Sequence, residues 1–269
     1  MSDNPNPVDR PLTIAGRQFK SRLIMGTGKW PDNETMVKAC EAGGTEMVTV
    51  AIRRIDLSPE RPEKNFIDYL KPAGFDLLPN SAGCFNAEEV VRTARLAREA
   101  TGTNWFKIEV IGDKKTLLPD VHGTIEAVKI LKAEDFVCLC YIPQDIVAAI
   151  RLFELGADAI MPLGSPIGSG QGLPDFAGLK FIVEELSGKV PIVVDAGIGA
   201  PSDAALAMEL GADACLINTS IAQAADPVAM ARAMKLGIEA GRAAYLAGRI
   251  PKKAYASAST TMEGMVGSQ

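Results

Sequence analysis

Two ionisable residues share one face of a predicted strand near the middle of the chain. The segment Trp105–Ile111 reads WFKIEVI, and its alternation places three apolar side chains on one face and Lys107 and Glu109 on the other. Ionised groups inside a protein are costly unless they are paired or functional. One interpretation is a structural lysine–carboxylate pair. The other is a Schiff-base lysine beside a proton-transferring carboxylate, with desolvation lowering the pKa of the lysine so that some free amine is present.

Polar residues follow two later predicted strands. Asp195 ends an apolar run and is followed by Ala196 and Gly197, so a carboxylate suited to acid–base work lies beside backbone that can approach an anion. Asn218 and Thr219 end the last predicted strand, just before a short helix start. In (β/α)8 barrels such loops recur as phosphate-binding sites. The alternative is that Asn218 and Thr219 serve only as helix caps.

A third candidate region is the loop MPLGSPIGSGQG over 161–172, which follows another predicted strand. Gly168 is one of four glycines within nine positions of this loop, a density that suits either ligand contact or a flexible connector. Its position at the end of a strand favours ligand contact.

Histidine and cysteine usage limits the chemistry. The only histidine, His122, lies in the polar stretch LPDVHGT, which predicts a solvent-facing loop rather than a triad or a metal site. The cysteines form no CxxC pair and lie mostly in apolar segments, which predicts buried free thiols in a reducing cytoplasm. They are Cys40, Cys84, Cys138, Cys140 and Cys215.

Charge and hydropathy exclude several partners. The 269 residues include 28 Lys and Arg against 33 Asp and Glu, a net charge of -5. This mild acidity argues against nucleic-acid and anionic-membrane binding, while backbone N–H groups can still hold a phosphate. No apolar run reaches the length of a membrane helix, and the polar, Pro-rich N-terminus is unlike a secretory signal. We therefore expect a soluble cytoplasmic protein.

Short apolar or β-branched runs alternate with longer amphipathic stretches along the chain. Eight runs are predicted as strands, at 22–26, 46–52, 76–80, 105–111, 136–142, 159–164, 192–196 and 214–218. Predicted helices cover 87–100, 124–132, 145–155, 176–186, 202–210 and 228–247. The turn ELGADA occurs at 154–159 and again at 209–214, which indicates a repeated strand–helix unit.

Eight such units in a chain of this length predict a single (β/α)8 TIM barrel. The competing doubly wound sheet would carry a dinucleotide-binding turn, but GTGK at 26–29 lacks the rest of that motif. We expect the barrel to span 12–248. A disordered extension at 1–11 precedes it, and a flexible tail rich in small residues follows at 249–269.

Several motifs resemble the bacterial thiazole synthase (ThiG) family of thiamine biosynthesis, in order from about Leu12 to Tyr255. They are GTGK, LPN, TNWFKIEVIGD, MPLGSPIGSGQG, VVDAGIG and INTSIA. The loop MPLGSPIGSGQG and the strand with K-x-E are the most specific of these. The loop YIPQDI at 141–146 lacks the Asp-Pro typical of the family, which affects the expected loop shape but not the matched chemical residues.

The resemblance implies an enzyme that condenses 1-deoxy-D-xylulose 5-phosphate, dehydroglycine and sulfur from the C-terminal thiocarboxylate of a small carrier protein, ThiS. It implies a Schiff base on Lys107, with Glu109 and Asp195 as acid–base carboxylates. The implied phosphate-sugar contacts are Gly168, Ala196, Gly197, Asn218 and Thr219. Because an imine is itself an electron sink, no PLP, metal or nucleotide cofactor is implied.

Two other functions stay open from the residues themselves. One is a Schiff-base aldolase that acts on sugar phosphates, and the other is a noncatalytic phosphate-ligand binder in which Lys107 and Glu109 are structural. The basic residues at 53–54 and 252–253 are either contacts for an acidic carrier or ordinary solvated charges. Large barrels often assemble, and we expect a homodimer or homotetramer.

Overall fold

Eight parallel strands form the centre of the molecule in the computed structural model, which describes residues 9–54 and 66–259. Hydrogen bonding joins them in the order β8-β7-β6-β5-β4-β3-β10-β9. The strands are β3 (Leu23–Gly26), β4 (Met47–Ala51), β5 (Asp76–Asn80), β6 (Trp105–Ile108), β7 (Val137–Ile142), β8 (Ala159–Pro162), β9 (Val193–Asp195) and β10 (Ala214–Ile217). These apolar runs are buried on both faces, as parallel strands require.

The two outer strands of this order, β8 and β9, meet and close the sheet into a barrel. Ile160 pairs with Ile192, and Leu163 pairs with Asp195, in parallel bridges. The Gly164 N–H also donates to the Asp195 carbonyl at 3.2 Å. Closure removes both free edges. It also brings the end of β9 to the same interior as the end of β6.

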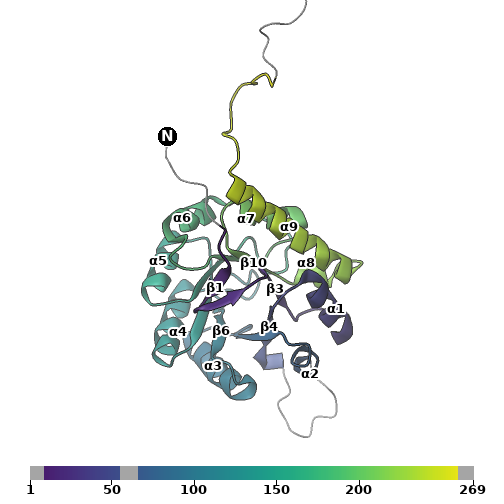
Figure 1. Cartoon of the computed structure of the whole chain (residues 1–269). Coiled ribbons are helices and arrows are strands. Elements are labelled where there is room, and N and C mark those ends of the chain that lie inside the picture. Colours follow the sequence, from purple (N-terminus) through teal and green to yellow (C-terminus); the bar gives the residue numbers. More distant parts are fainter. Residues whose placement is uncertain (1–8, 55–65, 260–269) are drawn as a thin grey trace, which may run out of the picture.

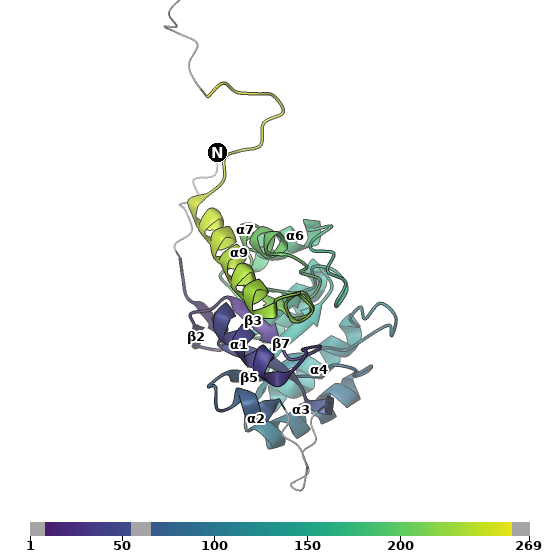
Figure 2. The ribbon, with the colours of Figure 1, turned by 90° about the vertical axis from the view of Figure 1, so that its right-hand side faces the viewer.

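Helices surround the strands (Figure 1), and α9 packs against both α1 and α7 (Figure 2). They are α1 (Asn33–Gly43), α2 (Ile67–Leu70), α3 (Ala87–Thr101), α4 (Val121–Ala133), α5 (Ile146–Glu154), α6 (Ala177–Leu186), α7 (Pro201–Glu209), α8 (Thr219–Ala222) and α9 (Pro227–Ala247), with the 3₁₀ turn η1 over Ile52–Arg54. Several begin at a residue whose side chain accepts a backbone N–H of the first turn, which fixes the start of the helix. These caps are Asp32, Asn86, Asp120, Asp145 and Asp226.

A small hairpin covers one end of the barrel (Figure 1). Its strands, β1 (Leu12–Ile14) and β2 (Arg17–Phe19), pair antiparallel. Their apolar side chains join the inward-facing residues of the barrel strands in one buried cluster. Phe19 packs edge-on against Trp105, the first residue of β6, with ring centroids 5.9 Å apart. The hairpin therefore fills the end where the strands begin, and the carboxyl ends of the strands form the open mouth.

The (β/α)8 barrel predicted from the sequence is confirmed. All eight predicted strands are present, with ends that differ by up to a few residues, and the six predicted helices correspond to α3 to α7 and α9. The hairpin has no counterpart among the predicted strands, because three-residue strands leave no periodic pattern. The five cysteines are buried free thiols, as predicted.

The loop predicted around His122 is wrong. His122 lies in the first turn of α4, where the Asp120 side chain accepts its backbone N–H at 2.9 Å. The polar residues that suggested a loop are those that cap the helix. The predicted solvent exposure of His122 is confirmed.

The expected division of the chain into extension, barrel and tail stays a prediction, since 1–8 and 260–269 lie outside the described residues. Asp9 forms ion pairs with Arg22 and Arg242. Residues 249–259 leave α9 with exposed side chains and run away from the barrel (Figure 2). Within the described ranges, no helix is long and apolar enough to cross a membrane.

Phe19→Ala is expected to lower the free energy of unfolding by about 3 kcal/mol, because it leaves a cavity at the filled end of the barrel. Leu96, which is 55% exposed on α3, supplies the control. Leu96→Ala is expected to change stability by less than ~0.5 kcal/mol. Chemical denaturation measures both variants, and equal stability of the two would contradict a core role for the hairpin.

Candidate active site

A cavity of about 480 Å³ opens at the carboxyl ends of the strands. Its walls come from the ends of β3 to β6 and from the loops that follow β8, β9 and β10. Every site residue singled out from the sequence lines it: Lys107, Glu109, Gly168, Asp195, Ala196, Gly197, Asn218 and Thr219. This end of a (β/α)8 barrel is where active sites lie.

Lys107 lies between two carboxylates. Its Nζ is 2.5 Å from Oδ2 of Asp195 and 3.8 Å from Oε2 of Glu109, and 5.4 Å from the ring centroid of Tyr141. None of the three charged residues is more than 6% exposed. The predicted alternation over 106–110 is confirmed, because Lys107 and Glu109 line the cavity. The apolar residues that alternate with them pack in the large core cluster, namely Phe106, Ile108 and Val110.

Burial and charge act in opposite directions on Lys107. Burial lowers its pKa, but the carboxylates of Asp195 and Glu109 together raise it by more, so the net direction is upward. The expectation that desolvation leaves free amine in the resting protein is therefore wrong. The resting Lys107 is an ammonium ion paired with Asp195, because the negative charge at short range outweighs burial.

The two carboxyl groups differ in their distance from this ammonium. Burial raises the pKa of Glu109, Lys107 lowers it, and Asp195 raises it further. Burial also raises the pKa of Asp195, against the effects of Lys107 and of the Ala196 N–H. Since Nζ is much closer to Asp195, Glu109 holds a proton more readily. One ammonium, one carboxylate and one carboxylic acid make a neutral cluster, which is the least costly charge state in a buried site.

The chain makes a left-handed turn directly after Asp195. Ala196 has φ 70° and Gly197 has φ 78°. A Cβ built on Gly197 would lie 1.9 Å from Oγ of Ser165, so only glycine fits there. Ala196 is an L residue in a strained conformation, and such residues gather where a site needs an unusual backbone. The turn brings the backbone of the loop after β9 against that of the loop after β8.

The backbone N–H groups at the end of this turn already have hydrogen-bond partners within the protein. Those of Gly199 and Ala200 donate to Oδ2 of Asp203 at 3.0 and 2.9 Å. These contacts fix the start of α7. Anion binding by this loop is therefore confined to the segment before Gly199.

Asn218 joins the end of β10 to the loop after β3. Its Nδ2 donates to the Gly28 carbonyl at 3.0 Å. Asn218 occupies the N-cap position of α8, as the helix-cap alternative expected, but its side chain makes no capping hydrogen bond. The buried Oδ1 of Asn218 and Oγ of Ser220 have no hydrogen-bond partner among the described residues. Unpartnered polar atoms beside a cavity suit a polar ligand.

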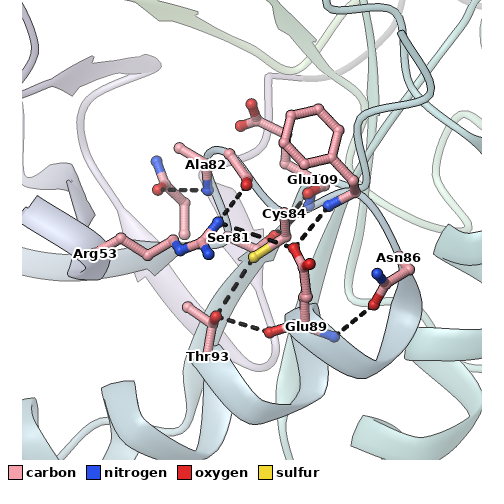
Figure 3. Close-up of polar contacts among 11 residues, drawn as sticks. Arg53, Ser81, Ala82, Cys84, Asn86, Glu89, Thr93 and Glu109 are labelled. Carbon is pink, nitrogen blue, oxygen red and sulfur yellow. Dashed lines mark hydrogen bonds and ion pairs between the residues drawn. The ribbon is translucent and has the colours of Figure 1, made fainter. Parts of the chain in front are cut away.

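Sequence reasoning missed Ser81, which holds the backbone that carries Glu109 (Figure 3). Its Oγ accepts the Glu109 N–H at 2.7 Å and donates to the Glu109 carbonyl at 2.9 Å. The Ser81 N–H donates to the Lys107 carbonyl at 3.3 Å. This buried hydroxyl extends the pairing of β5 with β6 past the point where both strands end. The only signal in the sequence is a serine directly after the strand DLLPN.

The loop that carries Ser81 is in turn anchored to α3 (Figure 3). Asn86 accepts the Glu89 N–H at 2.8 Å, and Oε2 of Glu89 accepts the Phe85 N–H at 3.1 Å. Arg53 reaches the same loop through the Gly83 carbonyl and lies 3.9 Å from Glu89. Arg53 is therefore engaged within the protein.

We find no candidate metal site in the part of the chain that the structure describes. No group of three or more His, Cys, Asp or Glu side chains there could hold a metal ion. Chemistry without a metal or other cofactor stays a prediction.

A closed (β/α)8 barrel with a buried lysine and two carboxylates at its open end defines a barrel enzyme of the TIM class. The family model described as "Thiazole biosynthesis protein ThiG" matches residues 13–261. The chain belongs to this family, the thiazole synthases of thiamine biosynthesis. The resemblance seen in the motifs is thereby confirmed.

Named relatives match nearly the whole chain. The thiazole synthase of Solibacter usitatus is 54% identical over 256 residues, covering 95% of this chain and 98% of that protein. The thiazole synthase of Geobacter sulfurreducens is 52% identical over 262 residues, covering 97% and 99%. Among solved structures, the Amycolatopsis orientalis BexX/CysO complex matches with a TM-score of 0.81 and 31% identity, covering 92% of this chain and all of that one.

Ser81→Ala is expected to lower the free energy of unfolding by about 1–3 kcal/mol, since it leaves the Glu109 N–H and carbonyl unpaired in a buried place. Thiazole formation is expected to fall as well, because Glu109 loses its fixed position. Thr13→Ala removes an exposed hydroxyl that donates to the Pro11 carbonyl and is expected to change neither quantity. Denaturation and turnover assays test both variants, and a Ser81→Ala protein with native stability and turnover would contradict this role.

Proposed function

We propose that the protein forms the thiazole phosphate moiety of thiamine from 1-deoxy-D-xylulose 5-phosphate, dehydroglycine and sulfur carried as the thiocarboxylate of a ThiS-type protein, through a Schiff base on Lys107. The observation that carries the proposal is the buried Lys107 ammonium, 2.5 Å from Asp195 within the cavity. Membership of the thiazole synthase family supports the overall reaction.

Lys107 must first lose a proton from Nζ before it can act as a nucleophile. Proton transfer from Nζ to Oδ2 of Asp195 turns the ion pair into a neutral amine and a carboxylic acid. Burial raises the pKa of Asp195, which favours its taking up this proton. The amine then adds to the ketone of the sugar phosphate. Glu109, the carboxyl that holds a proton more readily, protonates the departing hydroxyl so that water leaves and the imine forms.

The imine then draws electrons from the neighbouring carbon. A carboxylate removes the proton from that carbon, and protonation at the imine end moves the carbonyl one position along the sugar chain. The thiocarboxylate sulfur adds to the new carbonyl carbon, and the acyl–sulfur bond breaks as the carrier leaves as a carboxylate that takes the carbonyl oxygen with it. The sulfur then bonds to the imine carbon of dehydroglycine, and the dehydroglycine nitrogen displaces Nζ of Lys107 from the sugar. This closes the ring and releases the lysine, and water is lost. Asp195 and Glu109 both lie within 4 Å of Nζ, close enough to exchange protons during these steps.

The sugar phosphate is proposed to lie along Gly168, Ala196, Gly197, Asn218 and Thr219. All five line the cavity. The glycines let a phosphate approach the backbone closely. The unpartnered Oδ1 of Asn218 is suited to accept a sugar hydroxyl.

The sulfur carrier is proposed to dock at the mouth of the barrel, because its C-terminal thiocarboxylate must reach the intermediate on Lys107. The solved BexX/CysO complex supports a protein partner for this chain as well. A homodimer or homotetramer and a cytoplasmic location belong to the same proposal and stay predictions.

Borohydride reduction in the presence of 1-deoxy-D-xylulose 5-phosphate is expected to attach the sugar to Lys107, as a mass increase located on the peptide that contains it. Lys107→Ala is expected to keep the fold and to lose both adduct and turnover, because the two carboxyl groups left behind can take up protons. Lys189→Ala, at an exposed lysine paired with Glu185, is the control and is expected to keep both.

A native protein that forms no adduct would contradict the Schiff base. An adduct together with turnover in the absence of any sulfur donor would contradict the synthase and favour an aldolase.

Asp195→Asn is expected to shift the rising limb of the pH profile for imine trapping to lower pH. Asp195 makes the largest charge contribution that raises the pKa of Lys107, and the burial that lowers it stays. The maximal rate is expected to fall, because the proton acceptor is lost. Trapping rates measured across pH compare the native protein, Asp195→Asn and the exposed control Glu185→Gln. If the rising limb of the Asp195→Asn profile stays in place or moves to higher pH, the conclusion that Asp195 raises the pKa of Lys107 is contradicted.

A further inference from the structure

Lys29 lies in the loop after β3, and its ammonium group approaches the loop after β8. A Cβ built on Gly168 would lie 3.4 Å from Nζ of Lys29 and 3.6 Å from Oγ1 of Thr219. An ammonium from one wall and a hydroxyl from another therefore approach the same glycine. Gly168 and Thr219 both line the cavity.

The loop that carries Lys29 is held from several directions. The side chains of Thr27, Trp30 and Asn218 each donate to a backbone carbonyl, at 3.0, 2.9 and 3.0 Å, and together they tie this loop to β4, to β10 and to itself. Lys29 itself has φ 66°, a conformation that L residues rarely adopt. Such strain persists only where the surroundings enforce it. The loop thus sets the direction in which the Lys29 side chain leaves the backbone.

The positive charge on Lys29 has no ion-pair partner among the residues that the structure describes. No carboxylate of residues 9–54 and 66–259 forms an ion pair with it. By contrast, the ammonium of Lys107 deeper in the cavity is already balanced by Asp195. A ligand with a phosphate group brings a negative charge that the glycines and neutral hydroxyls of the mouth do not compensate. A lysine ammonium binds phosphate as a compact point charge.

We propose that Lys29 binds the phosphate of the sugar substrate against Gly168 and Thr219, and that it makes the site select phosphorylated over unphosphorylated sugar. This inference rests on the proposed function and assigns the side chain that provides the selection. Holding the phosphate at the mouth leaves the ketone end of the sugar directed toward Lys107. It also keeps the phosphate away from the negative charge of Asp195.

The test compares 1-deoxy-D-xylulose 5-phosphate with unphosphorylated 1-deoxy-D-xylulose as substrates for borohydride trapping on Lys107. Lys29→Met is expected to raise the concentration of the phosphorylated sugar needed for half-maximal trapping by about ten-fold, the effect of losing one charge-assisted contact at a partly exposed site. Trapping of the unphosphorylated sugar is expected to stay at the native level. Lys29→Arg is expected to restore most of the preference, and Lys189→Met, at the other end of the barrel, is expected to behave as native.

Three results would overturn the inference: an unchanged preference in Lys29→Met, an equal loss for both sugars, or no rescue by arginine. In each case an adduct in the native protein leaves the proposed function standing. If the native protein traps neither sugar, the proposed function fails, and calorimetric titration with inorganic phosphate decides the inference separately. Equal phosphate binding by the native and Lys29→Met proteins would then overturn it, whereas weaker binding by the variant would support it.

Discussion

An ammonium ion buried between two carboxyl groups is the interaction on which the rest of the structure depends. Lys107 lies on β6 and Asp195 at the end of β9, strands that are not neighbours, so the two side chains meet only in a closed barrel. The bridges between β8 and β9 provide that closure. Burial is tolerated because the cluster is neutral when Glu109 keeps its proton. The same balance holds the proposed nucleophile charged at rest and places Asp195, its proposed proton acceptor, in contact with it.

The two ends of the barrel differ: the closed end contributes to the hydrophobic core, and the open end holds the candidate active site. The hairpin fills the end where the strands begin with apolar side chains, and Phe19 packs there against Trp105. At the mouth, Lys29 and Ala196 have positive φ angles, as does Ala15 in the turn of the hairpin. Ala196 lines the cavity, and the ammonium group of Lys29 approaches Gly168, which also lines it. The sequence shows no basic patch, and the proposed phosphate site accordingly consists of glycines, neutral polar groups and Lys29.

Local sequence patterns were enough to predict which side chains face into the site. Alternation along one strand predicts that Lys107 and Glu109 face inward, because the direction of a side chain in a strand depends only on position. Distances between residues on different strands could not be predicted in this way. The 2.5 Å contact between Lys107 and Asp195 follows from barrel closure, and without it desolvation alone predicts the wrong direction for the pKa of Lys107. The role of Ser81 depends likewise on the register between β5 and β6, which no spacing in the chain reveals.

The central claim is that Lys107 is a buried ammonium at rest and becomes the imine nitrogen of the intermediate. Magnetic resonance of isotope-labelled lysine side-chain nitrogen tests it directly, with the Lys107 signal assigned by its loss in Lys107→Met. The account predicts an ammonium signal for Lys107 in the free protein at neutral pH, replaced by an imine signal when 1-deoxy-D-xylulose 5-phosphate is added. A neutral amine in the free protein, or an ammonium signal that saturating sugar phosphate leaves unchanged, would contradict it.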